Sequence, residues 1–148
     1  MTSRLARFRA LSWPEQRVVV VAMLLLPPFW IGLRVLGLSR FLTWLTRSPV
    51  VVRAPRSREE LAAIGALVNV AGNHVPFPST CLTRSLVLKW VLRCRGVDSE
   101  LRIGVRLNEG TFEAHAWVEH EGQPLNDAQD IAARFAAFNE PLSDRLFS

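Results

Sequence analysis

Three side chains of this sequence have the types and the order that nucleophilic catalysis needs: Cys81, His115 and Asp127. A thiol in the first turn of a helix lies near free N–H groups and the positive end of the helix dipole, which favour thiolate over thiol and can bind an oxyanion. His115 would then take the thiol proton, and Asp127 would hold the imidazole tautomer and stabilise imidazolium. The pattern predicts a Cys-His-Asp enzyme.

Each member of this trio also has an ordinary structural interpretation. A cysteine at a helix start is commonly a small buried apolar residue, and a histidine on a half-buried strand is commonly structural. Asp127 or the preceding Asn126 would serve equally as an N-cap. The sequence has no CxxC, HxxxH or HExxH motif, so we expect neither a metal site nor a cofactor.

The nucleophile's position depends on a helix expected over Cys81–Cys94. Thr80 or Ser79 is placed to cap its start, and Gly96 is placed to stop it.

A second helix is expected to begin at Arg58, where Ser57 and Glu60 form a capping box, and to run to about Val70. Gly72-Asn73 then ends it.

Alternating apolar residues predict three strands, which cover Leu101–Leu107, Phe112–Val118 and Gln123 to about Asp127. Two helices followed by three consecutive strands indicate an α+β fold with an antiparallel sheet.

The register of the last hairpin decides whether the histidine meets the aspartate. A three-residue loop, residues 120–122, with Gly122 in the left-handed conformation pairs His115 with Asp127 on one face of the sheet. A two-residue loop instead opposes Asp127 to Ala116 and turns the carboxylate to the other face. We expect the three-residue loop.

In the first hairpin, pairing Leu107 with Phe112 places Gly104 opposite His115. A glycine there leaves space for a substrate backbone, although glycine also marks bulges. Trp117, two residues after the histidine, is expected to shield the site from water.

Composition limits the class of protein. The chain has 148 residues and a net charge of +5. Its hydrophobic fraction of 49% excludes intrinsic disorder of the whole chain. Cys81 and Cys94 lie 13 residues apart on one expected helix, about 20 Å, so we expect free thiols and a reducing compartment. The arginines are scattered and no nucleic-acid motif is present, which argues against a nucleic-acid partner. A basic surface also suits an acidic peptide or an acidic partner protein.

The first 47 residues are basic and apolar. The apolar stretch Val18–Leu33 has 16 residues, whereas a spanning helix needs about 20. We expect a helix from Pro14 to Leu26, a break at Pro27-Pro28, and a second helix from Phe29 to Leu45. The predicted organisation is a helical hairpin over 1–47, a linker over 48–57 and a catalytic domain over 58–148. The hairpin would pack on that domain, dock a partner, or attach to a membrane surface.

The residues around the trio resemble the transglutaminase-like cysteine proteases, and more narrowly the leader peptidases of lasso peptide biosynthesis. The segments that carry the resemblance are CLTRSLVL from Cys81, RIGVR from Arg102, AHAWVE from Ala114 and the pair Asn126-Asp127. The resemblance implies a papain-like core over about residues 58–130, with Cys81 as nucleophile, His115 as base and Asp127 as third member.

The same resemblance implies a substrate and partners. The substrate would be a ribosomally made precursor peptide, cut between leader and core in the bacterial cytoplasm, with the membrane surface as the alternative location. A separate winged-helix protein would recognise the leader, and a separate ATP-dependent cyclase would close the core. The oxyanion side chain stays open among Asn73, Ser79 and Thr80. The rival hypotheses are an acyltransferase or amidase with another acceptor, a non-catalytic interaction protein, and a membrane-surface protein.

Overall fold

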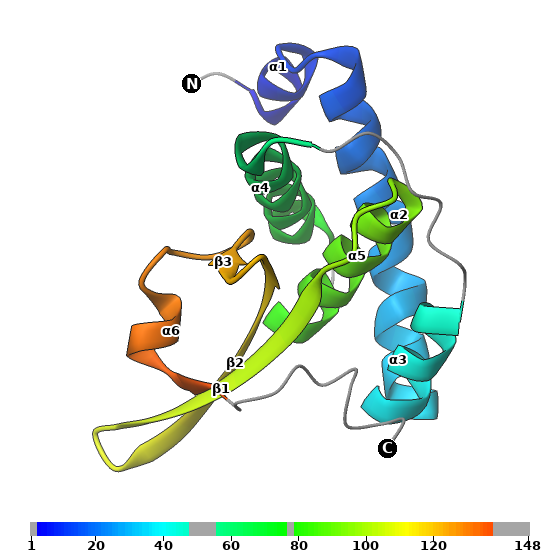
Figure 1. Cartoon of the computed structure of the whole chain (residues 1–148). Helices are drawn as coiled ribbons and strands as arrows, with labels where there is room; N and C mark the ends of the chain where they lie inside the picture. Colours follow the sequence, from blue (N-terminus) through cyan, green and yellow to red (C-terminus); the bar gives the residue numbers. More distant parts are fainter. Residues whose placement is uncertain (1–2, 48–55, 77–78, 138–148) are drawn as a thin grey trace.

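The computed structural model describes residues 3–47, 56–76 and 79–137 (Figure 1). The elements in chain order are α1 (Arg4–Arg9), α2 (Trp13–Leu36), α3 (Leu38–Arg47), α4 (Arg58–His74), α5 (Cys81–Cys94), β1 (Glu100–Asn108), β2 (Thr111–His120), β3 (Gln123–Pro124), α6 (Ile131–Arg134) and β4 (Ala136–Ala137). The expected α+β class is confirmed.

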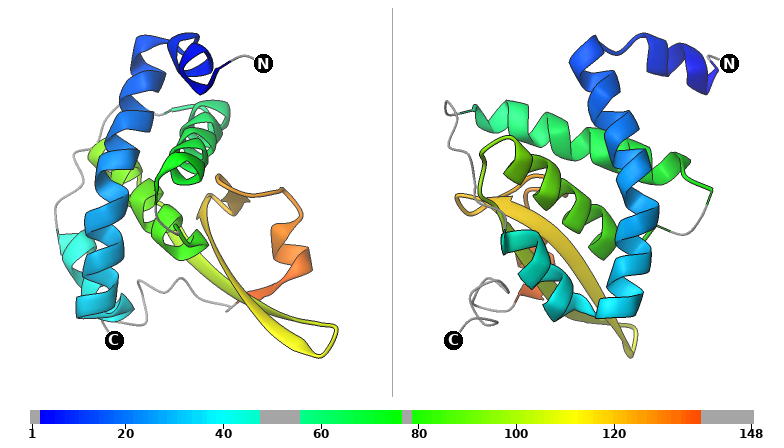
Figure 2. Two further views of the ribbon diagram at one scale, coloured as in Figure 1. Left: turned by 180° about the vertical axis from the view of Figure 1, so that it is seen from behind. Right: turned by 90° about the vertical axis from the view of Figure 1, so that its right-hand side faces the viewer.

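The helices and the sheet form layers. The strands follow the order β3-β2-β1-β4, and every neighbouring pair is antiparallel. Helices α4 and α5 lie between this sheet and the long helix α2, as the views in Figures 1 and 2 agree. The short helix α6 lies on the other side of the sheet.

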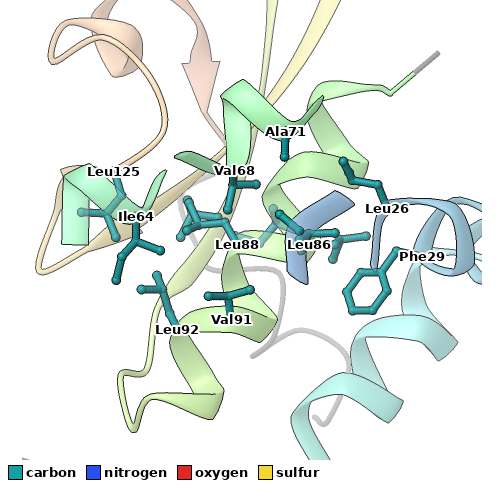
Figure 3. Close-up of a cluster of buried hydrophobic side chains, with 14 of the residues drawn as sticks. Leu26, Phe29, Ile64, Val68, Ala71, Leu86, Leu88, Val91, Leu92 and Leu125 are labelled. Carbon is teal, nitrogen blue, oxygen red and sulfur yellow. The ribbon is translucent and has the colours of Figure 1, made fainter. Parts of the chain in front are cut away.

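One apolar core joins the N-terminal helices to the rest of the chain. It includes buried side chains of α2, α3, α4, α5, β1, β2 and the segment after β3. Figure 3 labels ten of them: Leu26, Phe29, Ile64, Val68, Ala71, Leu86, Leu88, Val91, Leu92 and Leu125. The predicted division at 48–57 stays a prediction, and residues 48–55 of that linker lie outside the described residues.

The expected break at Pro27-Pro28 is wrong, because α2 continues through both prolines to Leu36. The side chains that flank the prolines, Leu26 and Phe29, are buried in the core, and this packing outweighs the two missing N–H donors. The chain turns instead at Gly37, whose φ of 77° favours glycine, and α3 follows.

The continuous helix also changes the membrane argument. With 24 residues, α2 is long and apolar enough to cross a bilayer, and 28% of its most apolar 18-residue window is buried inside the protein. Core helices of soluble proteins and signal sequences meet the same two criteria, length and apolarity.

Helix α5 has the predicted bounds. The hydroxyl of Thr80 accepts from the Thr83 N–H, and Gly96 follows the last turn with a φ of 78°. Helix α4, by contrast, does not stop at Gly72-Asn73 but runs to His74. Gly72 is buried within α4, where the side chain of Arg84 lies against it.

The first hairpin has the predicted register, with Leu107 opposite Phe112 and Gly104 opposite His115. The expected three-residue loop in the second hairpin is wrong. Glu121 and Gly122 form a two-residue turn with φ of 51° and 77°, so that residue 120 pairs with 123. The third strand also ends earlier than expected, at Pro124 instead of about Asp127.

Candidate active site

The three candidate catalytic side chains line one pocket of about 510 Å³. They come from separate elements: Cys81 begins α5, His115 lies on β2, and Asp127 follows β3. The pocket lies beside β2, where the two-residue strand β3 has ended. The sequence thus brings a thiol, an imidazole and a carboxylate to one cavity.

The imidazole and the carboxylate are in direct contact. The Nε2 atom of His115 and Oδ2 of Asp127 form a hydrogen-bonded pair, with the two side chains 26% and 23% exposed. The other carboxylate oxygen, Oδ1, accepts from the Ala128 N–H at 2.8 Å. The Nδ1 atom of His115 has no hydrogen-bond partner among the described residues. It is therefore the ring nitrogen available to a nucleophile or substrate.

Asp127 reaches His115 because the chain leaves the strand ladder. With the observed two-residue turn, a longer β3 would turn this carboxylate to the other face. The Leu125 N–H still donates to the Val118 carbonyl at 2.9 Å, and one residue later the chain departs from strand geometry. The predicted contact of Asp127 with His115 is present, but its predicted route, strand pairing, is wrong.

Asn126 takes over the hydrogen bonding that the strand gives up. Its Oδ1 atom accepts from the Val118 N–H at 2.9 Å, and its Nδ2 donates to the Ser85 hydroxyl at 3.1 Å. Its carbonyl accepts from the Asn69 amide at 2.9 Å. Asn126 therefore ties the segment before Asp127 to β2, α5 and α4. From the sequence, Asn126 was expected to act at most as a helix cap, and its place beside Asp127 in the Asn-Asp pair was the available signal.

Cys81 and His115 share the pocket from different sides of the sheet. Ala116 and Val118 point into the main core beside α5, so His115, by strand alternation, belongs to the opposite face. The half-buried Cys81 reaches the pocket from the first turn of α5. No hydrogen bond joins Cys81 to His115 within the described part of the chain. Catalytic hydrogen bonds commonly tighten only when substrate is bound.

Aromatic side chains support the imidazole from behind. The fully buried Trp117 stacks on His115 with ring centroids 6.1 Å apart, and Phe135 lies 5.2 Å away. The indole N–H donates to Oε1 of Glu119 at 2.9 Å, which fixes the ring. Trp117 does shield one side of His115, but it does not line the pocket as a substrate-binding residue would.

Gly104 lies opposite His115 as predicted, yet it leaves no space for a substrate. A Cβ atom on Gly104 would lie 2.8 Å from Cβ of Phe135 and 3.0 Å from the Trp117 ring. The glycine is needed because these two side chains approach the sheet closely. The expected role of Gly104 in substrate binding is therefore not supported by its surroundings.

The three oxyanion candidates differ in position. Asn73 and Ser79 line the pocket, whereas the Thr80 hydroxyl caps α5. The Ser79 hydroxyl donates to the Gly72 carbonyl at 2.8 Å and accepts from Nε of Arg84 at 2.9 Å. Arg84, which the sequence analysis did not single out, is the cation of the pocket lining.

The described residues contain no group of three or more His, Cys, Asp or Glu side chains that could hold a metal ion. The functional groups that line the pocket include a thiol, an imidazole, a carboxylate, amides and a guanidinium.

Comparison with known proteins identifies a family and a relative of this chain. The family profile described as the transglutaminase-like superfamily matches residues 23–140. The microcin J25-processing protein McjB of Escherichia coli is 42% identical over 64 residues, which cover 43% of this chain and 30% of McjB. No solved structure gives a significant match.

Proposed function

Because this chain belongs to the transglutaminase-like superfamily, we propose that it is a cysteine peptidase that removes the leader from a lasso precursor peptide. One observation carries the proposal: Cys81, His115 and Asp127 line one pocket, and the last two are hydrogen bonded. A fold of this kind supports many chemistries, so the residues of the site decide which reaction is proposed.

The proposed reaction begins when Nδ1 of His115 takes the proton of the Cys81 thiol and the thiolate attacks the scissile carbonyl. The tetrahedral intermediate collapses to a thioester as the imidazolium gives its proton to the leaving amine. A water molecule, deprotonated by the same imidazole, then hydrolyses the thioester and releases the thiol and a carboxylic acid. Asp127, hydrogen bonded to Nε2, keeps the proton on that nitrogen and stabilises imidazolium.

The substrate and partners belong to the same proposal. The relative's name describes it as a processing protein for microcin J25, and the aligned stretch is less than a third of that relative. We infer a ribosomal precursor peptide as substrate, a separate winged-helix protein that recognises its leader, and a separate ATP-dependent cyclase that acts on the freed core. Two free thiols suit the bacterial cytoplasm, with attachment to a membrane surface as the other location.

Mass spectrometry of the products tests the activity. The full chain is incubated with a lasso precursor peptide and its leader-binding protein, beside Cys81→Ala and, as a matched control, Cys94→Ala. Cys94 is exposed at the far end of α5, so its loss should leave cleavage unchanged. Hydrolysis gives fragments whose masses sum to the precursor plus one water, whereas acyl transfer adds the acceptor instead. An uncut precursor, or cleavage that survives Cys81→Ala, contradicts the proposal.

Thiol reactivity tests the catalytic pair without any substrate. Iodoacetamide alkylation of both cysteines is followed by peptide mass mapping. Cys81 is only half-buried and Cys94 is exposed, so access alone makes Cys94 the faster. Faster alkylation of Cys81, lost in His115→Ala, is the result expected for a thiolate activated by imidazole. Alkylation of Cys81 that is slower than that of Cys94 and unchanged by His115→Ala would indicate a non-catalytic protein.

A further inference from the structure

The guanidinium of Arg84 lies in the lining of the pocket that holds the thiol, and no carboxylate is paired with it among the described residues. The one carboxylate in the pocket lining, that of Asp127, is engaged by His115. An unpaired cation in a partly buried pocket is unusual, because burial without a counter-charge is unfavourable.

The side chain of Arg84 is held in place at its inner end. Its Nε donates to the Ser79 hydroxyl at 2.9 Å, and that hydroxyl donates to the Gly72 carbonyl. Gly72 has no Cβ atom, and one built there would overlap Nε and Cζ of Arg84. The terminal nitrogens Nη1 and Nη2 have no hydrogen-bond partner in the described part of the chain. The guanidinium is thus held in one orientation, and none of the described residues accepts a hydrogen bond from its two terminal nitrogens.

The position of Arg84 relates it to the bond under attack. Arg84 is three residues after Cys81 on α5, so their Cβ atoms are about 5–6 Å apart on one helix face. An extended peptide advances about 3.3–3.6 Å per residue. A carboxylate that reaches Arg84 is therefore either formed from the acyl carbon itself or carried by a residue within about two positions of it.

We propose that Arg84 forms a carboxylate-binding subsite next to the nucleophile, with Ser79 and Gly72 as its positioning residues. The subsite deepens the proposed peptidase function and rests on it for the identity of the ligand as a peptide. Two peptide groups supply a carboxylate here: an acidic side chain beside the scissile bond, and the C-terminal carboxylate that hydrolysis creates on the acyl product. Guanidinium binds both through paired N–H donors.

Binding to the full-length Cys81→Ala variant separates these two sources. The probes are acetyl-pentaalanine as the acid and as the amide, and two further amides in which the fourth alanine is replaced by Asp or by Asn. Binding is followed by the NMR shifts of backbone N–H groups around the pocket, which every variant retains, and by the Nε–H signal of Arg84 where that residue is present. If the product carboxylate is the ligand, the acid should bind about tenfold more tightly than its amide. If an acidic side chain is the ligand, the peptide with Asp should bind about tenfold more tightly than the peptide with Asn.

Substitutions of the cation provide the controls. Arg84→Gln should abolish the discrimination and Arg84→Lys should keep part of it, with circular dichroism to confirm folding of both. Arg40→Gln removes an arginine of α3 that lines another pocket, and should change nothing. Equal affinities across the four peptides, no binding of either carboxylate at millimolar concentration, or discrimination that survives Arg84→Gln would each overturn the subsite.

The outcome is independent of cleavage. If the Cys81→Ala variant binds the carboxylate peptides more tightly than their amides but the wild type cleaves no precursor, the subsite is supported and the peptidase proposal is contradicted. Cleavage of a precursor by the wild type, together with equal affinities, supports the peptidase and removes the subsite.

Discussion

Replacing Asn126 by alanine should destabilise the protein and disconnect Asp127 from its support. The substitution removes the acceptor of the Val118 N–H and the donor to the Ser85 hydroxyl, and both residues are fully buried. An unsatisfied buried N–H costs about 1–3 kcal/mol, and a lost hydrogen bond costs about 0.5–1.5 kcal/mol net. The Ser85 hydroxyl keeps its hydrogen bond to the Ala116 carbonyl, so losing the bond from Asn126 to Ser85 costs less than leaving the Val118 N–H unsatisfied. The expected decrease in unfolding free energy is about 2–4 kcal/mol.

This free energy converts to a shift of the melting temperature. Unfolding entropy of about 2.1 cal/mol/K per residue gives about 0.3 kcal/mol/K for a chain of 148 residues. We therefore expect Asn126→Ala to melt about 6–13 °C below the wild type, measured by differential scanning calorimetry. Precursor cleavage should also slow at temperatures where the variant is still folded, since Asp127 is no longer fixed against His115.

The pocket contains a matched control. Asn73 is an exposed asparagine in the same lining, and its side chain makes no hydrogen bond within the described residues. Asn73→Ala is the same chemical change and should alter the unfolding free energy by no more than about 0.5 kcal/mol. Equal melting temperatures for Asn73→Ala and Asn126→Ala would refute the argument that the Asn126 side chain replaces the strand ladder.

Three further results are expected. Gly104→Ala should lower the unfolding free energy by about 1–3 kcal/mol, read from urea titration, because its Cβ would press on Phe135. The pKa of Glu15 is lowered chiefly by the hydrogen bond from the Ser12 N–H and then by the one from the Ser12 hydroxyl. Glu15→Gln should therefore lower the melting temperature at pH 7. The difference in melting temperature between wild type and variant should shrink as the pH falls below 4.5, the ordinary pKa of the carboxyl, and vanish below the lowered pKa. Cys94→Ser should leave both melting and cleavage within error of the wild type, because the thiol is exposed and distant from the pocket.

Local signals in the sequence were enough to predict the elements that position Cys81 and His115. A capping hydroxyl at Thr80 and a glycine at 96 define α5 at both ends. Period-two alternation defines β1 and β2, and with it the facing pair of Gly104 and His115. These features depend on residues near one another in the chain, so propensity and pattern determine them.

Features set by tertiary packing were not predictable in the same way. The break expected at Pro27-Pro28 does not occur because Leu26 and Phe29 are held in the core. Gly104 was expected to open space, but Phe135, which is 31 residues away, fills it. Local rules contain no information about which distant side chain will approach.

The contact between His115 and Asp127 shows how a correct expectation can depend on a wrong step. The predicted three-residue turn and longer β3 would have opposed them within the ladder, but the real turn has two residues. The contact forms because the strand ends early and Asn126 replaces it with side-chain hydrogen bonds. Replacement of backbone pairing by a side chain leaves no periodic signal in the sequence.

The separate origins of the site's members have a consequence for unfolding. His115 and Asp127 are 12 residues apart and belong to one hairpin and the segment after it, whereas Cys81 lies on α5, which packs on β2. That docking buries Leu86 and Leu88 in the main core and cannot be lost without the core. We therefore expect the proposed site to be lost together with the global fold: in increasing denaturant, the proposed cleavage should disappear at the midpoint of core unfolding and not before it.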